Sequence, residues 1–501
     1  TSIGYKYYIP KGVTLIKDND FNQKFDNLCS ENKLIGSNIV VCDKDNVLEK
    51  CCYGYQDLDS KLPSSLNTIY RIASISKTVG AIALMQLEEK GLIDLDEDIS
   101  KYLGFKVCNP NFPNDIITVK MLTMQTSSIQ DGYDDENPLY DDIRKGYNGI
   151  NGTYLDVSLK TLLTDTKSEY YTDLTFGNYK PGTRFCYSNF GCGIMACIIE
   201  MVSGELYVDY MENHIFKPLG LNASFKASRI LGKENIATMY YKTSSGLHSV
   251  VKERFTESKL PVFPLGNNYR GPAGGLFISM NELSVIMRMF MNYGTYNGIE
   301  ILKRETVEKM YQMTWCGLPN DNYRAKGLQM KIIRDVDSFT LRGHTGGAYG
   351  VRSYMFFNLR QGLGACFITN GIDACDDSAY CNNVFYGTQK EWIEKYGKEL
   401  KTDVVITKDE IVLPERKIIH KDLFINKDNP YILGKAFADA IDQVPVYDED
   451  KMTFTITVNN HEHIINDVIV YKDELYINLE NSLKELKINY KKENDKYLLT
   501  L

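Results

Sequence analysis

Three absences narrow the class of protein before any motif is considered. The sequence has no block of basic residues, and its net charge of −8 gives no reason to bind nucleic acid or an anionic membrane. No apolar run reaches the roughly 18 residues that a membrane-spanning helix needs. No internal repeat or low-complexity segment interrupts the 501 residues. What remains is a globular chain, long enough for a large core and for more than one domain.

Patterns for metals and disulfides are also scarce. The 12 cysteines include no C-x-x-C pair, which excludes the common zinc sites. His461 and His463 stand two apart on an expected strand and face one side of it, so a metal site is an alternative there. Because no third ligand is in view, exposed strand histidines are the favoured interpretation. We expect the cysteines to be reduced, buried thiols. Cys375 and Cys381, six apart in an irregular segment, are the first pair to test for a disulfide.

Hydrophobic periodicity predicts the elements of secondary structure. Helices are expected over 20–33, 74–90, 191–202, 281–293 and 383–396, and strands over 37–42, 47–53, 328–333, 338–342, 351–358 and 364–370. The polar, aperiodic segment 131–152 is expected to run over the surface. After about residue 400, alternating runs at 453–458, 467–471, 474–478 and 497–501, with a helix at 431–441, predict a small antiparallel β module.

The stretch Arg71-Ile-Ala-Ser74-Ile-Ser-Lys77 opens the expected helix 74–90 and is the first candidate for chemistry. Ser74 and Lys77 are three residues apart, so their side chains share one face of the helix. A hydroxyl is inert at its own pKa, but a neighbouring amine can accept its proton once burial or nearby cations have lowered the pKa of the amine. The same spacing also arises by chance, as a serine near a helix start with a surface lysine, so it needs support from the rest of the chain.

Further polar stretches flank other buried elements. Tyr187 and Asn189 lie in the loop that enters the apolar helix 191–202, and Gly343-His-Thr-Gly-Gly347 follows the strand expected at 338–342. The glycine-rich turn 271–275 lacks the G-x-x-x-x-G-K-[ST] pattern of a phosphate loop, so close packing of its backbone is the favoured role.

Ser74-x-x-Lys77, Tyr187-x-Asn189 and His344-Thr-Gly346, in this order, resemble the motifs of the penicillin-recognising serine hydrolases, among which S-x-x-K and K-T-G are typical. The closer likeness is to the branch with class C β-lactamases, DD-peptidases, esterases and D-aminopeptidases, over about residues 15–398. It implies an α+β fold, in which an antiparallel sheet is flanked by helices and accompanied by an all-helical subdomain. We therefore expect a hydrolase domain over 1–398, with a helical insert at about 95–330, and a C-terminal β-rich accessory module over 399–501.

The resemblance also implies a role for each motif residue. Ser74 matches the acylated nucleophile, Lys77 the lysine that accepts or relays its proton, and Tyr187 the tyrosine that transfers protons to and from the leaving group. The positions that match substrate-binding residues are Asn189, His344, Thr345 and Gly346. The backbone N–H groups of Ser74 and Gly347 match the oxyanion hole. No metal or other cofactor is expected, because Lys77 and Tyr187 supply the proton chemistry.

Three departures from the family's pattern bear on the substrate. His344 stands where β-lactamases and DD-peptidases usually have a lysine that attracts the substrate carboxylate, and histidine is mostly neutral at pH 7. Thr123-Met-Gln-Thr-Ser-Ser128 stands where relatives often read T-H-T-S-G, so that loop lacks a glycine. No E-x-x-L-N element is evident, so deacylation is left to Tyr187 or to the substrate. The sequence favours a peptidase or esterase that cleaves an amide or ester of a small molecule or short peptide.

Two other functions stay open. One is a true β-lactamase or D-Ala-D-Ala carboxypeptidase, and the other is a catalytically silent binding or scaffold protein on the same fold. The chain begins with Thr1 rather than Met, as expected of a trimmed or mature form. The dilute cysteines favour the cytoplasm, an exported form stays open, and the sequence does not indicate an oligomeric state.

Overall fold

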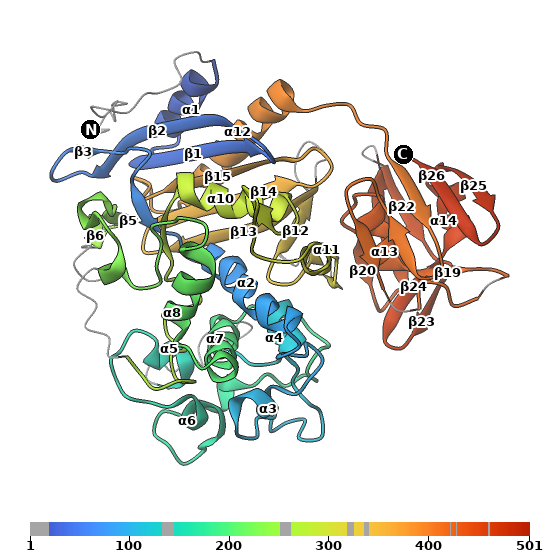
Figure 1. The fold of residues 1–501 in the computed structure, drawn as a ribbon, viewed down its shortest axis with the longest axis horizontal. Helices are drawn as coiled ribbons and strands as arrows, with labels where there is room; N and C mark the ends of the chain where they lie inside the picture. The colour runs from blue at the N-terminus through green and yellow to red at the C-terminus, as the bar shows by residue number, and fades with distance from the viewer. Residues whose placement is uncertain are drawn as a thin grey trace. The chain divides into compact units, whose positions relative to one another are not determined.

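A computed structural model describes residues 20–132, 145–250, 262–317, 325–334, 340–420, 422–426, 428–458 and 461–501. The chain forms two compact units (Figure 1). Unit 1 comprises Thr1–Lys303, His344–Phe356 and Gly364–Lys395, and unit 2 comprises Arg304–Gly343, Phe357–Leu363 and Tyr396–Leu501. Both units are therefore built from segments that are distant in the sequence.

A sheet forms the frame of unit 1. Its strands lie in the order β13-β14-β15-β1-β2-β3, and β1 pairs antiparallel with β2, as β2 does with β3. The bounds are β1 Gly36–Asp43, β2 Val47–Asp57, β3 Leu62–Pro63, β13 Thr340–Ala348, β14 Val351–Asn358 and β15 Leu363–Thr369. The carboxylate of Asp43 accepts hydrogen bonds from the N–H groups of Asp45 and Asn46, which closes the predicted β1–β2 hairpin. This sheet joins strands from residues 36–63 with strands from residues 340–369.

Helices cover both faces of this sheet. Cys366 and Phe367 are neighbours on β15, so their side chains point to opposite faces. The thiol of Cys366 lies 3.8 Å from the sulfur of Met287 on α10 (Met280–Met291), whereas the ring of Phe367 packs against Phe25 of α1 (Asp20–Glu31) and Phe385 of α12 (Ser378–Tyr396). Figure 1 shows α10 on one side of the strands, and α1 with α12 on the other.

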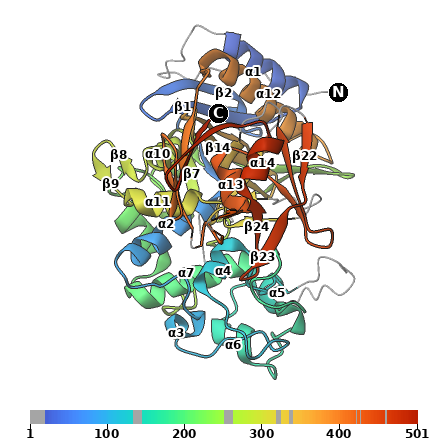
Figure 2. The same ribbon diagram turned by 90° about the vertical axis from the view of Figure 1, so that its right-hand side faces the viewer.

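A second part of unit 1 consists mainly of helices, gathered around α7 (Figure 2). α2 (Ile75–Glu89) and α7 (Asn189–Ser203) pack against each other and are buried along most of their length, as their nearly continuous apolar sequences require. Around them lie α3 Ile99–Leu103, α4 Val119–Met124, α5 Gly146–Ile150, α6 Leu159–Thr164 and α8 Tyr207–Met211. The predicted α+β fold, with its flanked sheet and helical subdomain, is confirmed.

Short strands complete unit 1. β4 (Ile69–Arg71) pairs antiparallel with β7 (Phe277–Ser279), β5 (Met239–Thr243) with β6 (Gly246–Val250), and β8 (Thr295–Tyr296) with β9 (Ile299–Glu300). The first of these pairs matters most for chemistry, because β4 leads into α2 and β7 follows the glycine-rich turn.

The prediction that residues 131–152 run over the surface is wrong for several described residues of that segment, although Asn151 and Gly152 at its end are exposed. Asp131, Tyr147 and Ile150 are buried, and the ring of Tyr147 stacks on that of Phe190 with centroids 5.2 Å apart. Residues 133–144 lie outside the described residues. Tyr147 and Ile150 are three apart on α5, a helix too short to show a period within its polar surroundings.

Unit 2 is rich in β-strands, as expected of the C-terminal residues. Its strands pair as β18-β17-β16-β26-β25, as β19-β24-β23 and as β20-β21-β22, while β10, β11 and β12 pair in sequence and β12 pairs with Thr340–Gly343. The strands are β10 Trp315–Cys316, β11 Ala325–Lys326, β12 Lys331–Arg334, β16 Asp403–Ile406, β17 Glu410–Val412, β18 Lys417–Ile419, β19 Tyr431–Leu433, β20 Val446–Asp448, β21 Thr453–Val458, β22 His461–Ile465, β23 Val468–Tyr471, β24 Glu474–Asn478, β25 Asn489–Glu493 and β26 Lys496–Thr500. The helices are α11 Arg304–Tyr311, α13 Gly434–Ala440 and α14 Leu479–Glu485.

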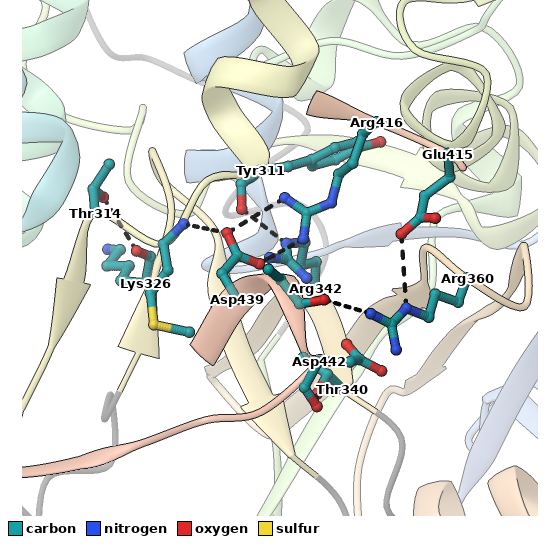
Figure 3. A network of polar contacts seen from close by, with 12 residues as sticks. Tyr311, Thr314, Lys326, Thr340, Arg342, Arg360, Glu415, Arg416, Asp439 and Asp442 are labelled. Carbon is teal, nitrogen blue, oxygen red and sulfur yellow. Dashed lines mark hydrogen bonds and ion pairs between the residues drawn. The ribbon is translucent and has the colours of Figure 1, made fainter. Parts of the chain in front are cut away.

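A buried ionic network lies within unit 2 (Figure 3). One carboxylate oxygen of Asp439, on α13, accepts hydrogen bonds at 2.5 Å from both Arg342 and Arg416. Arg342 also donates to the carbonyl of Tyr311, and the second oxygen of Asp439 accepts from the N–H of Met313. The carboxylate of Asp439 thus links Met313, Arg342 and Arg416, which are far apart in the sequence.

Two further sequence-based expectations concern cysteines and membranes. All 12 cysteines are free, as expected, but only eight are buried: Cys108, Cys186 and Cys316 are partly exposed and Cys375 is exposed. Among the described residues, no single helix is long and apolar enough to cross a membrane. The two helical segments Asn189–Ser203 and Tyr207–Phe216 are together long and apolar enough for a membrane span, by length and composition only, but they are bent by 79° relative to each other.

Candidate active site

Ser74 lies between β4 and α2, and its hydroxyl is not used to cap the helix. It is the N-cap residue of α2 and has helical backbone angles. Ala73, directly before it, has a φ of 55°, a left-handed conformation that costs energy in any residue with a Cβ. The pairing of β4 with β7 and the hydrogen bond from the N–H of Ile72 to the carbonyl of Leu276 hold this turn in place.

Lys77 lies one turn along α2, and its amine meets the hydroxyl of Ser74. Nζ of Lys77 donates a hydrogen bond to Oγ of Ser74 over 2.9 Å and another to the carbonyl oxygen of Ala273 over 2.8 Å. The lysine is fully buried, and burial lowers its pKa from 10.5 to about 8, because the charged form loses its hydration. A substantial share of the amine is therefore neutral near pH 8, and the neutral amine is the form that accepts a proton from Ser74.

The glycine-rich turn 271–275 supports this lysine. Ala273 lies inside the turn, and the carbonyl oxygen of Gly271 accepts hydrogen bonds from the N–H groups of Gly274 and Gly275. A Cβ on Gly275 would lie 2.7 Å from that carbonyl oxygen, so the turn needs glycine there. The turn is closely packed, as the sequence predicted. This packing holds the carbonyl oxygen of Ala273 in place as a hydrogen-bond acceptor for Lys77.

Tyr187 lies beside the same amine. Nζ of Lys77 is 4.8 Å from the centre of the Tyr187 ring, close enough for a favourable cation–π contact when the lysine is charged. The ring centroids of Tyr187 and His344 are 6.3 Å apart. Residues from the S-x-x-K, Y-x-N and H-T-G stretches thus meet within unit 1, although they are separated by more than a hundred residues.

Asn189 is held by a carboxylate that the sequence did not suggest. Asp131 accepts hydrogen bonds from the side-chain amide of Asn189 at 3.1 Å and from the backbone N–H groups of Asn189 and Phe190. It also accepts one from the hydroxyl of Ser188 at 3.2 Å. Burial raises the pKa of Asp131, while these donors and the charge of Lys77 oppose the rise. A carboxylate at the first N–H groups of α7 is also favoured by the helix dipole.

The signal for Asp131 in the sequence was weak. It is one acidic residue at the start of a segment with many, and its partners lie 57 to 59 residues further along the chain. Only the fold brings Asp131 to the start of α7.

The H-T-G stretch lies within β13, which continues to Ala348 and not only to the expected end at residue 342. His344 is fully buried, and its Nδ1 lies 2.5 Å from the carbonyl oxygen of Thr345. A Cβ on Gly346 would lie 2.9 Å from the backbone nitrogen of Ser74, so this strand passes directly against the start of α2. Gly347 follows at an exposed position, next in the chain to the point of contact with Ser74.

The loop that lacks a glycine adopts the glycine conformation anyway. Ser128 has a φ of 68°, in the left-handed region, and its hydroxyl accepts a hydrogen bond from the side chain of Asn109. The carbonyl of Ser128 accepts one from the N–H of Gly177, which fixes the backbone. Ser128 therefore holds the left-handed conformation that usually favours glycine, with its side chain and its carbonyl both hydrogen-bonded.

The alternative metal site gains no further ligand. His461 and His463 lie on β22, and Nδ1 of His463 is 3.5 Å from a carboxylate oxygen of Glu485. In the part of the chain that the structure describes, no group of three or more His, Cys, Asp and Glu side chains is placed to hold a metal ion.

The family model called Beta-lactamase matches residues 21–380 of this chain. Protein flp of Staphylococcus aureus (strain MRSA252) is 30% identical over 357 residues, which make up 70% of this chain and 63% of that protein. The chain therefore spans somewhat less than two thirds of the length of this relative.

Solved structures show the same fold at lower identity. EstCE1, described as a hydrolase with promiscuous acyltransferase activity, superposes with a TM-score of 0.58 and 18% identity, over 74% of this chain and 97% of that one. The octameric penicillin-binding protein homologue from Pyrococcus abyssi superposes with a TM-score of 0.55 and 21% identity, over 96% of this chain and 99% of that one. The second likeness extends into the C-terminal residues.

Proposed function

Since this chain belongs to the beta-lactamase family, as its motifs predicted, we propose that it is a serine hydrolase, which cleaves an amide or ester bond of a small substrate through an acyl-enzyme on Ser74. The observation that carries the proposal is the buried amine of Lys77, with its lowered pKa, 2.9 Å from the hydroxyl of Ser74. Burying a lysine costs free energy, so a lysine with only a structural role is not expected at this position.

The proposed reaction begins with proton transfer. Neutral Lys77 accepts the proton of Ser74 as Oγ attacks the substrate carbonyl, and the backbone N–H groups of Ser74 and Gly347 stabilise the oxyanion. The packing of Gly346 against the nitrogen of Ser74 supports this pairing of donors. Losing one such donor typically costs about 2.7–4 kcal/mol of transition-state stabilisation.

Tyr187 then passes its phenolic proton to the leaving group, and as a phenolate it takes one from the water that attacks the acyl group. Lys77 returns its proton to Oγ of Ser74 as the bond between the acyl group and Oγ breaks. The place of Tyr187 beside the amine of Lys77 supports its role, because a phenol with a pKa near 10 transfers protons at neutral pH only with a cation nearby. Asn189 binds the substrate carbonyl, and Asp131 keeps its amide oriented.

The substrate class follows from His344. A fully buried histidine attracts a substrate carboxylate less strongly than the lysine usual at this position. We therefore place esters, amides and short peptides before β-lactams and D-Ala-D-Ala peptides as substrates. We also keep residues 1–398 as the proposed hydrolase domain and 399–501 as its accessory module.

The test is turnover of a matched panel: a p-nitrophenyl ester, a D-amino acid amide, a D-Ala-D-Ala peptide and a chromogenic cephalosporin. We expect the ester or the amide to be hydrolysed fastest, and Ser74→Ala to remove this activity. Ser244→Ala, at an exposed position of the β5–β6 turn, is the control and should match the unmodified protein. Unchanged turnover in Ser74→Ala would refute the proposed nucleophile, and fastest turnover of the cephalosporin would favour a true β-lactamase. Absence of turnover across the panel would favour the scaffold function.

A further inference from the structure

One residue at the end of α4, Gln125, binds the backbone on both sides of Tyr187. The carbonyl oxygen of Gln125 accepts a hydrogen bond from the N–H of Cys186 at 2.8 Å. Oε1 of its side chain accepts another from the N–H of Ser188 at 3.0 Å. Cys186 and Ser188 are the two chain neighbours of Tyr187, so Gln125 fixes the chain directly before and directly after this tyrosine.

The backbone of Gln125 is itself held in place. It is the C-cap residue of α4, and its N–H donates to the carbonyl oxygens of Leu122 and Met121. Its φ of 60° lies in the left-handed region, which residues with a Cβ adopt only where the surroundings impose it. The next residue, Thr126, donates to the carbonyl oxygen of Met121 and accepts from the N–H of Gly182. The hydrogen bonds to Cys186 and Ser188 therefore start from a fixed point.

The side chain of Gln125 is buried for the sake of one hydrogen bond. It is only 2% exposed, and its Nε2 has no hydrogen-bond partner in the part of the chain that the structure describes. The N–H of Ser188 can only donate, so the end of the amide that faces it is the oxygen. Burying Nε2 without a partner costs free energy, which an apolar side chain would avoid. The hydrogen bond to Ser188 is therefore what glutamine contributes here.

Ser188 extends this constraint to the start of α7. Its hydroxyl accepts from the N–H of Gly191 at 2.9 Å and lies 3.2 Å from a carboxylate oxygen of Asp131. Tyr187 thus lies between one residue bound to the end of α4 and another that caps α7, and these two helices pack against each other. With its backbone held in this way, the ring of Tyr187 lies 4.8 Å from Nζ of Lys77.

We propose that Gln125 is a positioning residue, which holds Tyr187 where its phenolic proton can reach the leaving group. The inference rests on the proposed function, because it needs Tyr187 to be the proton donor. Proton transfer depends on hydrogen-bond distance, and a misplacement of about 1 Å can cost a hundredfold in rate. Substrates whose leaving group needs a proton therefore depend on Gln125, whereas substrates whose leaving group departs as a stable anion do not.

The test compares two esters of one acid, p-nitrophenyl butyrate and ethyl butyrate, on the full chain. p-Nitrophenolate departs without a proton and ethoxide needs one, so only the ethyl ester requires Tyr187 during acylation. Gln125→Met keeps the length of the side chain and removes the acceptor. We expect it to lower kcat/KM for ethyl butyrate by about tenfold to hundredfold, and kcat/KM for p-nitrophenyl butyrate far less. Gln23→Met, at an exposed position of α1, is the control and should change neither value.

A cycle with Tyr187→Phe shows whether Gln125 acts through this tyrosine. Phenylalanine has no phenolic proton to place, so Gln125→Met should have little further effect on ethyl butyrate in a Tyr187→Phe background. Equal losses for the two esters in Gln125→Met would overturn the proposal and leave Gln125 with a structural role. Independent effects of the two substitutions would overturn it as well, and so would turnover of the p-nitrophenyl ester alone by the unmodified protein.

A failure of the proposed function would look different, because hydrolysis of p-nitrophenyl butyrate would then persist unchanged in Ser74→Ala. Should Gln125→Met fail to fold by circular dichroism, Gln125→Asn decides instead. Asparagine keeps the amide but withdraws its oxygen by one carbon–carbon bond, so the ethyl ester should again lose more than the p-nitrophenyl ester, by a smaller factor. Equal losses for both esters in Gln125→Asn would contradict the positioning role.

Discussion

Lys77 controls when Ser74 can react, because a charged amine cannot accept a proton. Burial lowers the pKa of Lys77 to about 8, so we expect kcat/KM for an ester to rise with pH, with a midpoint near 8. The free energy of unfolding should also rise between about pH 8 and 10.4, since in that window the unfolded chain binds a proton that the folded one does not. A pH–rate profile checks the first statement. A profile that is flat across that range would contradict the role of Lys77 as base.

Substitution of Asp131 should change the pH at which activity rises. Its negative charge raises the pKa of Lys77, so Asp131→Asn should shift the rising limb to lower pH. The same change weakens the hold on the Asn189 amide, and kcat/KM at the plateau should fall about tenfold or more, as for loss of a charged hydrogen bond. The measurement is the full pH profile, with the exposed Asp173→Asn as control. A lower plateau with an unmoved limb would limit Asp131 to a structural role.

At the scale of secondary structure, the sequence predicted the long buried elements and missed the short ones. α2, α7 and α10 were placed within a few residues, because apolar side chains over three or four turns have few other ways to be buried. The helix α5 was missed, since a single turn shows no period. The strand before the H-T-G stretch was expected to end at residue 342, whereas β13 continues to Ala348, because glycines and polar residues show no strand pattern when the partner strands are unknown.

The contact between β13 and the start of α2 can be tested by adding one carbon atom. A Cβ on Gly346 would lie 2.3 Å from Oγ of Ser353 and 2.5 Å from the carbonyl oxygen of Ile72, in addition to its approach to Ser74. Gly346→Ala must therefore displace β13 or the nucleophile turn, and a displacement of about 1 Å can cost a hundredfold in rate. We expect such a loss in kcat/KM. Gly152→Ala, where an added Cβ meets nothing within 4 Å, should keep full activity. Equal activity of both variants would contradict the close approach.

At the scale of the whole molecule, the C-terminal residues share a compact unit with 304–343 and 357–363, segments that the motifs had assigned to the hydrolase domain. The network of Asp439 with Arg342 and Arg416 lies inside that unit (Figure 3). No pattern in the sequence indicates this network, because the three residues are far apart in the chain and each is of a type usually found at the surface.

Asp439→Asn tests the importance of this network. It leaves two buried guanidinium groups without their anion, and we expect it to lower the free energy of unfolding by about 3–5 kcal/mol. The chain has 2 tryptophans, and Trp315 lies in the same unit as Asp439. Denaturation followed by fluorescence in a Trp392→Phe background therefore reports on that unit, with the exposed Asp450→Asn as control. Equal transition midpoints for Asp439→Asn and Asp450→Asn would show that the network contributes little.

Acid should weaken the same unit. Burial alone would raise the pKa of Asp439, but the charges of Arg416 and Arg342 outweigh it and hold the pKa well below its usual range. The folded state then binds this proton less readily than the unfolded state, so the contribution is complete above about pH 4 and is lost as the pH falls further. The Trp315 transition should move to lower denaturant below about pH 4, and in Asp439→Asn this part of the pH dependence should disappear. The same acid slope in both proteins would contradict the assignment.

The central claim is that Ser74 becomes acylated. Intact mass is to be measured after mixing the protein with a fluorophosphonate, a p-nitrophenyl ester, a penicillin and a cephalosporin, with Ser74→Ala treated in parallel. The account predicts a covalent adduct of the unmodified protein with at least the fluorophosphonate, and none with Ser74→Ala. An adduct that persists in Ser74→Ala, or no adduct from any probe on protein shown to be folded, would contradict it.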